Sequence, residues 1–309
     1  MATAEPKDVA DYIRPLNMNG LRGRMLHMPP PKGKKREILF VYGHHSSLER
    51  WWGVMQDLNQ YGGVTMPDLP GFGGMDSFYK IGKKPTYDAL ADYMASFIKL
   101  RYKNKKVTVV GLSLGFVVAT RMLQRYPDLA KQVDLLVSVV GFCHRDDFGF
   151  SRRRYWFYRL GAALFTNRIT AFFFKNLALN PLVLRAAYAR TNNARHKFKN
   201  KDKEEFKKIM NIEIGLWHSN DVRTYMYTAN QFFKLDNCRT QVNLPVWHIR
   251  VKNDQYFDGH LVEQHMRIIF NDFHQVVSKA DGHGPSVIAD IKEAGPMLPT
   301  KIRKLLAET

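Results

Sequence analysis

The chain has little cysteine and no long apolar run. Its two cysteines, Cys143 and Cys238, lie far apart among 309 residues and match no metal-binding or redox spacing. The longest stretch without a charged residue, Val107 to Thr120, has 14 residues, fewer than the ~20 that a membrane-spanning helix needs. The first fifteen residues contain acids and no apolar centre, unlike a secretory signal. We therefore expect a cytoplasmic protein with reduced thiols, either free or peripherally bound to a membrane.

Acidic residues are scarce beside basic ones. The chain has 47 Lys and Arg but 28 Asp and Glu, and its net charge of +19 predicts attraction to membrane headgroups, nucleic acid or an acidic substrate. Residues 142–240 hold 19 of the basic and 8 of the acidic residues, so +11 of the charge lies there, with 19 of the 39 aromatic residues. The basic stretch 194–208 lacks a base-reading motif and is interrupted by acids, so we expect no nucleic-acid partner.

Short apolar runs rich in β-branched residues alternate with helical patterns at both ends of the chain. Such near-continuous apolar strands are typical of a parallel sheet that is covered on both faces. Ser46 stands three residues before Glu49 and predicts a capping box at the start of one of the helices. The runs predict strands at 36–43, 62–69, 106–112, 133–141, 244–251 and 272–280, with 21–28 as an earlier edge strand.

The middle of the chain has helical patterns only. Between residues 142 and 240 no strand pattern occurs, and the strand alternation resumes at Leu244. We therefore predict an α/β fold in which a mostly parallel central sheet is flanked by helices. Residues 1–141 and 241–309 would form this core, and 142–240 an all-helical lid insertion. The helical pieces break at Asn167, Asn180-Pro181 and Asn192-Asn193.

The sequence Gly111-Leu112-Ser113-Leu114-Gly115 interrupts the longest uncharged run. A buried strand before it and a helical pattern after it predict a sharp turn that exposes the Ser113 hydroxyl as a nucleophile. Glycine is expected at 111 and 115 because a Cβ there would collide with the adjoining strand or helix. The simpler alternative is a packing turn of small residues between a strand and a helix.

Two further residues complete a candidate triad in the chain order Ser, Asp, His. Asp254 follows the strand at 244–251, and His283 lies between two glycines after the strand at 272–280. Because the carboxyl ends of parallel strands meet at one edge of a sheet, we expect these side chains to converge on the serine. Taken singly, they would be an ordinary loop carboxylate and an ordinary turn histidine. Asp258 is the alternative acid, although its position fits a helix N-cap better.

Two main-chain N–H groups are candidates for an oxyanion hole. The Leu114 N–H directly follows Ser113 at a helix N-terminus, which favours negative charge. The second donor should come from the loop after an earlier strand, where Gly43 permits a tight turn and the His44 N–H is preferred to that of His45. The side chains of these two histidines either line the pocket or lie exposed.

With these residues placed, the chain resembles proteins of the α/β-hydrolase fold over roughly 20–141 and 241–309. Two departures concern the side chains around the site. Tyr42 stands where the family often has histidine, and the serine that the family has shortly after the second glycine of its Pro-Asp loop is displaced to Ser77. The motifs that carry the resemblance are YGHHSS at 42–47, PDLPGFGG at 67–74, GLSLG at 111–115, KNDQYF at 252–257 and GHGP at 282–285.

The resemblance implies acyl transfer without a metal or organic cofactor. Ser113 would attack, His283 would move the proton, and Asp254 would hold His283 in the right tautomer. A serine at this place argues against epoxide hydrolase and haloalkane dehalogenase chemistry, which needs aspartate there. The expected function is hydrolysis of an ester or other acyl bond of a hydrophobic substrate, as by a carboxylesterase or lipase. The alternatives are a carbon–carbon bond hydrolase with the same triad and a non-catalytic binding protein that kept the fold.

Aromatic and basic residues alternate between 151 and 190. One interpretation is an amphipathic helix whose apolar stripe of Phe157, Leu160 and Leu164 faces the core while its basic face is solvated. The other is a lid whose apolar face covers an acyl pocket while Arg152–Arg154 contact the anionic headgroups of a membrane.

Overall fold

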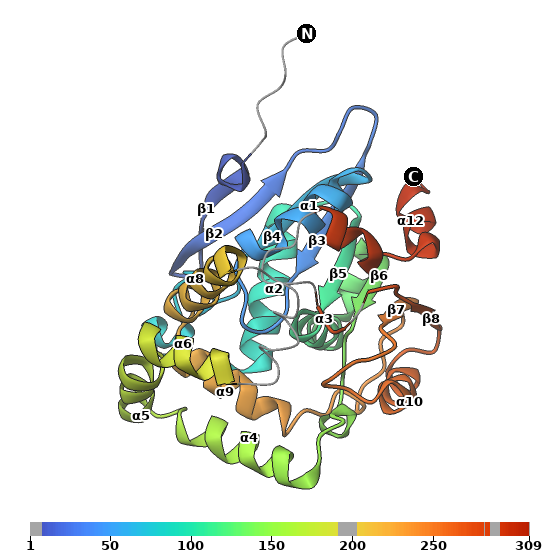
Figure 1. Cartoon of the computed structure of the whole chain (residues 1–309). Coiled ribbons are helices and arrows are strands. Elements are labelled where there is room, and N and C mark those ends of the chain that lie inside the picture. Colours follow the sequence, from blue (N-terminus) through green and yellow to red (C-terminus); the bar gives the residue numbers. More distant parts are fainter. Residues whose placement is uncertain (1–7, 191–202, 281, 285–290, 309) are drawn as a thin grey trace.

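One eight-stranded sheet organises the structure, a computed structural model that describes residues 8–190, 203–280, 282–284 and 291–308 (Figure 1). The strand order is β1-β2-β4-β3-β5-β6-β7-β8. Neighbouring strands from β4 to β8 are parallel, whereas β1 and β2 pair antiparallel with their neighbours. The strands are β1 (Ile13–Met18), β2 (Leu21–Met28), β3 (Arg36–Val41), β4 (Gly62–Pro67), β5 (Val107–Leu112), β6 (Val133–Val139), β7 (Val246–Arg250) and β8 (Phe273–Val277).

The six strands predicted for the parallel sheet are all present, which confirms the α/β fold with a mostly parallel sheet. The segment 21–28 is also a strand, but the outermost strand is β1, which the apolar pattern does not indicate. β1 contains Pro15 and is mostly exposed, as an edge strand can be. Asn19 and Gly20 close the β1–β2 hairpin with φ angles of 53° and 78°, the positive values that a tight two-residue turn needs.

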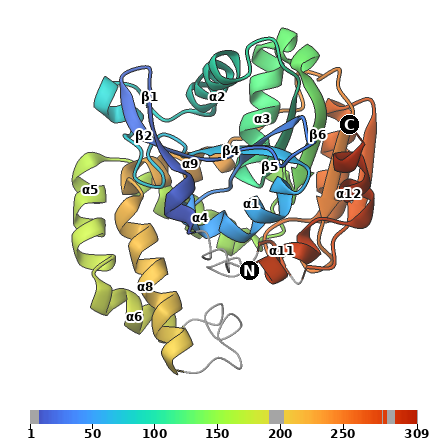
Figure 2. The ribbon, with the colours of Figure 1, turned by 90° about the horizontal axis from the view of Figure 1, so that it is seen from above.

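Helices cover both faces of the sheet. Figure 2 shows α2 (Tyr87–Arg101) and α3 (Leu114–Arg125) on one face and α1 (Trp52–Asn59) with α11 (Ile291–Ala294) on the other. α10 (Gly259–Ile269) connects β7 to β8, and α12 (Thr300–Ala307) follows α11. Short 3-10 helices occur at Val9–Tyr12, Glu49–Trp51, Phe78–Ile81, Pro127–Gln132, Arg145–Asp147 and Gly295–Met297.

The capping box predicted for Ser46 and Glu49 is wrong. The first turn is the 3-10 helix Glu49–Trp51, and its N-cap residue Leu48 gives no side-chain hydrogen bond. The Ser46 hydroxyl instead accepts a hydrogen bond from the Trp51 indole at 2.5 Å, and Glu49 pairs with Arg24 at 2.6 Å. Trp51, five residues further along the chain, and Arg24 of β2 therefore bond the two side chains that the local pattern assigned to the cap.

The described part of 142–240 is helical apart from isolated bridges, and it lies between β6 and β7. Asn167 caps one of its helices and Asn180 bonds the first turn of another, at the predicted breaks. The predicted break at Asn192-Asn193 lies outside the described residues. The helices are α4 (Arg152–Leu164), α5 (Arg168–Phe173), the π-helix Phe174–Ala178, α6 (Pro181–Arg190), α8 (Lys203–Ser219) and α9 (Val222–Phe232).

The interpretation in which Phe157, Leu160 and Leu164 face the core is wrong. These side chains are 74%, 64% and 58% exposed. α4 instead packs on α9, with Ala162 buried and the Tyr155 hydroxyl donating to the Phe233 carbonyl, directly after α9, at 3.2 Å. The bulkiest residues of α4 therefore face outward. In the described residues no helix combines the length and apolar character that crossing a membrane requires.

Candidate active site

Ser113 lies on the turn between β5 and α3. Its φ of 50° and ψ of −114° are values that a residue with a side chain rarely adopts. The two flanking glycines explain how the chain makes this turn. A Cβ at Gly111 would lie 2.7 Å from the Phe116 Cα, and a Cβ at Gly115 would overlap the Val41 carbonyl oxygen. The Ser113 N–H donates to the Val139 carbonyl at 3.0 Å, which fixes the strained residue to β6.

We expect Gly115→Ala to lower the free energy of unfolding by about 3 kcal/mol, since the new methyl would overlap main-chain atoms of β3 that cannot rotate away. Gly161→Ala in α4 is the matched control. A Cβ there meets no heavy atom within 4 Å, so this variant should be neutral or up to about 1 kcal/mol more stable. Urea unfolding of both purified variants measures the difference, and equal midpoints would contradict the steric argument.

Asp254, His283 and Ser113 form one continuous hydrogen-bonded chain. Asp254 follows β7, and His283 lies after β8 in the described segment 282–284. The His283 Nδ1 is 2.8 Å from the Asp254 Oδ2, and its Nε2 is 3.0 Å from the Ser113 Oγ. The structure therefore brings together the three residues that the sequence placed at the carboxyl ends of different strands.

The Asp254 carboxylate is held ionised at neutral pH. Burial raises its pKa, but the hydrogen bond from His283, the attraction of the carboxylate to that imidazole when it is protonated, and the N–H groups of Tyr256 and Phe257 outweigh burial, so the pKa lies below its usual value. Both N–H groups donate to Oδ1, at 2.8 and 3.2 Å, which leaves Oδ2 for the imidazole. An ionised carboxylate can only accept, so Nδ1 carries the proton and Nε2 is free to accept one from Ser113.

Asp258 is the N-cap of α10, the alternative to the triad acid that its position in the sequence predicts. Its carboxylate accepts from the N–H groups of His260 and Leu261 at 2.9 and 3.2 Å and caps α10. His283 pairs with Asp254, so the two candidate acids have separate partners.

The two main-chain N–H groups that the sequence suggests for an oxyanion hole belong to Leu114, directly after the serine, and to His44 in the loop after β3. Leu114 is the first residue of α3, so its N–H has no acceptor within the helix. His44 follows Gly43, and no hydrogen bond of its main-chain N–H is found within the described residues. A Cβ at Gly43 would lie 2.8 Å from the Leu112 side chain and 3.3 Å from the Ser113 Cβ, so glycine lets this loop approach the nucleophile.

The His44 side chain is bonded to α9, part of the helical block that the described helices α4 to α9 form between Arg152 and Phe232. Its Nε2 is 2.9 Å from the Thr228 Oγ1 and 3.2 Å from the Tyr225 carbonyl, and its ring stacks on Tyr225 with centroids 4.1 Å apart. A carbonyl only accepts, so Nε2 carries the proton. Burial, together with the charge of neighbouring His45, lowers the pKa of His44 to about 3, which keeps the ring neutral at physiological pH. No pattern near His44 indicates these partners, because they lie more than 180 residues away in α9.

Tyr42, which departs from the usual histidine, joins two loops of the site. Its hydroxyl donates to the Asp68 carboxylate at 2.9 Å and accepts from the Leu69 N–H at 2.8 Å. The turn after β3 is thereby fixed to the Pro-Asp loop at 67–74. The displaced Ser77 bonds Thr224 of α9 at 2.7 Å, so this loop also contacts the helical block.

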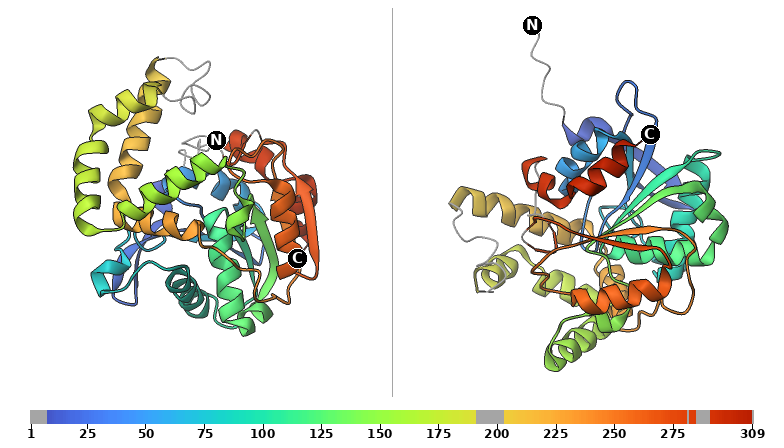
Figure 3. Two further views of the ribbon diagram at one scale, coloured as in Figure 1. Left: turned by 90° about the horizontal axis from the view of Figure 1, so that it is seen from below. Right: turned by 90° about the vertical axis from the view of Figure 1, so that its right-hand side faces the viewer.

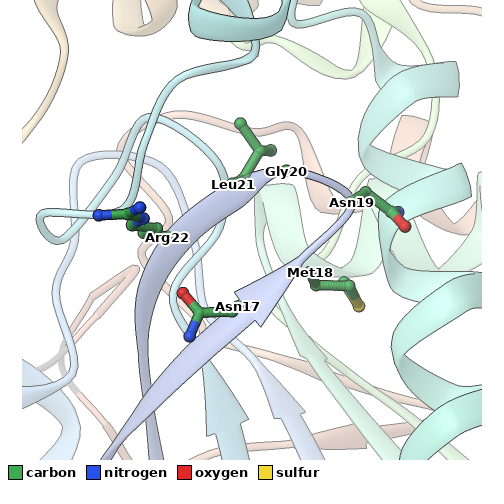
Figure 4. A pocket seen from close by; sticks show the side chains of 6 residues that line it. All are labelled: Asn17, Met18, Asn19, Gly20, Leu21 and Arg22. Atoms are coloured by element: carbon green, nitrogen blue, oxygen red, sulfur yellow. The ribbon is translucent and has the colours of Figure 1, made fainter.

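Two open hollows do not include the triad. One, of about 580 Å³, surrounds the β1–β2 turn, and Figure 4 shows its labelled side chains pointing in different directions rather than converging. The other, of about 590 Å³, is lined by residues of α8 and by Arg24 of β2, Ser47 and Arg50. Nor do the described residues contain a group of three or more His, Cys, Asp or Glu side chains that could hold a metal ion.

A profile of the alpha/beta hydrolase fold matches residues 38–281. Among curated proteins, "Protein ABHD8" of Homo sapiens and of Bos taurus are each 31% identical to this chain over 108 residues. The match covers 34% of this chain and 24% of each relative, so it spans about a quarter of the length of those proteins.

Solved structures share the fold at low identity. A deformylase from Pseudomonas putida S16 superposes with a TM-score of 0.62 and 17% identity, over 88% of this chain and 93% of that one. An esterase from Exiguobacterium antarcticum gives 0.61 and 14%, over 92% of both chains. The epoxide hydrolase CorEH gives 0.59 and 14%, over 95% of this chain and 96% of its own. Because their activities differ, the chemistry of this chain must be argued from its own residues.

Proposed function

The chain belongs to the alpha/beta hydrolase fold family, and from that premise we propose that it is a serine hydrolase. It would hydrolyse an ester or other acyl bond of a hydrophobic substrate through an acyl-enzyme on Ser113. One observation carries the proposal: the hydrogen-bonded chain from Asp254 through His283 to Ser113, which ends on a strained turn at a helix N-terminus.

In the acylation step, the Ser113 Oγ attacks the carbonyl carbon while its proton moves to the His283 Nε2. The carbonyl π electrons move to oxygen, and the resulting anion is stabilised by the Leu114 and His44 N–H groups and by the N-terminus of α3. The intermediate then collapses. The bond to the leaving oxygen breaks, and that oxygen takes the proton from His283, which leaves an ester on Ser113.

In the deacylation step, His283 accepts a proton from water as the water oxygen attacks the acyl carbon. The second tetrahedral anion collapses, the Ser113 Oγ takes the proton back, and the carboxylic acid leaves. Asp254 stays ionised throughout and stabilises the imidazolium that forms twice per turnover.

Aromatic side chains around the imidazole support a hydrophobic substrate. The rings of Tyr256 and Phe257 each lie 5.1 Å from the His283 ring. Phe257 stacks on Phe142 at 4.4 Å, and Phe148 lies 5.0 Å from Phe257. An apolar surrounding of this kind favours an acyl or alkyl group and strengthens the electrostatic interactions within the site. Within the part of the chain that the structure describes, no feature specifically favours a carbon–carbon bond over an acyl bond.

A fluorophosphonate probe tests whether Ser113 is a nucleophile. We expect the folded wild-type protein to be labelled, and the label to disappear in Ser113→Ala, because the probe phosphonylates, with loss of fluoride, only a serine that an adjacent base activates. Ser96→Ala in α2 removes a hydroxyl that bonds a helix carbonyl and should label like wild type. Absence of labelling on correctly folded wild type would reject the hydrolase and favour a binding protein of the same fold.

A further inference from the structure

Large apolar side chains are exposed mainly on one part of the molecule. Of fifteen that lie exposed in the described part of the chain, eleven fall between Trp156 and Val183, on α4, α5, the π-helix and α6. We call the exposed side chains of these helices, from Arg152 to Arg185, the outer face. Its most exposed apolar members are 62–76% exposed: Phe157, Leu160, Ile169, Phe172, Leu177 and Leu182.

The outer face lies away from the sheet. Figure 1 shows α4 and α5 at the lower edge of the molecule, and seen from below α4 crosses in front of the rest (Figure 3, left). α5 and α6 lie outermost, with α8 between them and the core (Figures 2 and 3). The helical block also has a small apolar core of its own, to which Ala171, Leu179 and Leu184 contribute from the same helices. These helices therefore bury one side and leave another apolar side without cover in the described structure.

The charge of the outer face has a single sign. Residues 148–190 contain eight Arg and Lys and no Asp or Glu. In the described ranges, no ion pair with a carboxylate is found for the exposed cations of this face, Arg152, Arg153, Arg154, Arg168, Lys175 and Arg185. Some guanidinium groups lie over aromatic rings instead. Arg154 is 4.5 Å from the Phe150 ring centroid, and Arg159 is 4.9 Å from that of Trp156.

We propose that the outer face docks on an anionic lipid bilayer. A second copy of the chain would bring one unpaired cationic face against another, which like-charge repulsion disfavours. A bilayer surface offers an apolar interior beneath a layer of negative headgroups, and this combination complements both features of the face. Exposed aromatic and aliphatic side chains enter the headgroup boundary, while arginine and lysine stems keep their charges at headgroup level.

Several cations act together in this docking. Each Lys or Arg near an anionic leaflet contributes about 1 kcal/mol, so three of them account for roughly a hundredfold in partitioning. The attraction acts within about a Debye length and weakens with salt. The docking does not depend on the proposed hydrolase chemistry. It would, however, bring a lipid surface to helices that pack on α9, whose Tyr225 and Thr228 hold His44 beside the serine.

Vesicle flotation of the full chain tests the proposal. We expect wild type to float with phosphatidylcholine vesicles that contain phosphatidylserine, to remain largely free with pure phosphatidylcholine, and to be released by 0.5–1 M salt, at roughly a 3–4 Å screening length. Removing three outer-face cations (Arg152→Gln, Arg153→Gln, Lys175→Gln) should lower the partition coefficient at least about tenfold. Lys32→Gln, Lys35→Gln and Lys103→Gln remove the same charge from exposed positions elsewhere and should change it far less.

A second pair of variants tests the apolar part. Phe157→Ser, Leu160→Ser and Phe172→Ser together should reduce flotation, whereas Leu100→Ser, Ile268→Ser and Ile291→Ser, at exposed apolar positions elsewhere, should not. Circular dichroism verifies that each variant is folded. Equal flotation of each outer-face variant and its control would overturn the proposal, as would wild type that floats with neither vesicle. Sedimentation velocity tests whether a second copy of the chain binds the outer face instead. If wild type is a dimer and the apolar outer-face variant is a monomer, the outer face is a dimer interface.

Discussion

Ser113→Ala should lower kcat for a p-nitrophenyl ester by about 10⁵-fold, and His283→Ala should cost nearly as much. The two side chains act as one unit. Without the hydroxyl there is no nucleophile, and without the imidazole the hydroxyl, 3.0 Å from Nε2, has no acceptor for its proton. The rate that remains reflects binding and oxyanion stabilisation alone. KM should change little, because neither group is needed to bind the ground state.

The double variant makes this prediction sharper. Independent effects would multiply to about 10¹⁰-fold, whereas members of one catalytic unit should together cost about what either costs alone. Steady-state kinetics of the two single variants and the double variant on one ester measure this. Ser96→Ala and His260→Ala, at positions outside the hydrogen-bonded chain, control for the loss of any hydroxyl or imidazole. Multiplicative losses would show that Ser113 and His283 do not act on the same proton.

The parallel part of the fold could be predicted because its strands are buried on both faces and therefore read as apolar runs. β5 is buried at every position, and its apolar pattern locates it to within one residue. β1 is an edge strand whose side chains are mostly exposed, so it has no such pattern. The Asn19-Gly20 pair was the available signal, since this dipeptide is typical of a tight hairpin turn.

The candidate site could be predicted where topology dictates it. Parallel strands end at one edge of the sheet, so a serine after β5, an aspartate after β7 and a histidine after β8 are brought together whatever the loops do in detail. The surroundings depend on contacts distant in sequence. Nothing near His44 indicates that its ring bonds Thr228, which lies 184 residues further along the chain.

The orientation of α4 could not be read from its own pattern, because aromatic and basic residues surround the helix on most sides. Its periodicity fits a buried stripe of Phe157, Leu160 and Leu164 as well as a buried side at Tyr155 and Ala162. The choice depends on α9, whose following residue Phe233 accepts the Tyr155 hydroxyl bond and packs edge-on against that ring at 4.8 Å. Hydrophobic periodicity identifies a helix, but its neighbours decide which side is buried.

Asp254→Asn should lower kcat by about 10³–10⁴-fold while the structure of the site stays intact. The Asp254 Oδ1 accepts from two main-chain N–H groups, so the variant's amide oxygen must take that place, and its NH₂ group must face His283. An NH₂ group donates, which forces the proton from Nδ1 to Nε2. The imidazole then points an N–H at Ser113 and cannot accept its proton, although every distance is preserved.

Asp258→Asn is the matched control, because it makes the same chemical change at the other carboxylate that the sequence offered. Asn caps helices as well as Asp does, so α10 should keep its N-cap and activity should stay near wild type. Kinetics on one ester, together with unfolding of both variants, separate catalysis from stability. Equal and small losses at the two positions would remove Asp254 from the mechanism, and a larger loss at Asp258 would assign the role to that residue. A loss confined to Asp254 with an unchanged KM is the result that tautomer control requires, since the substrate would still bind beside an imidazole whose proton is on the wrong nitrogen.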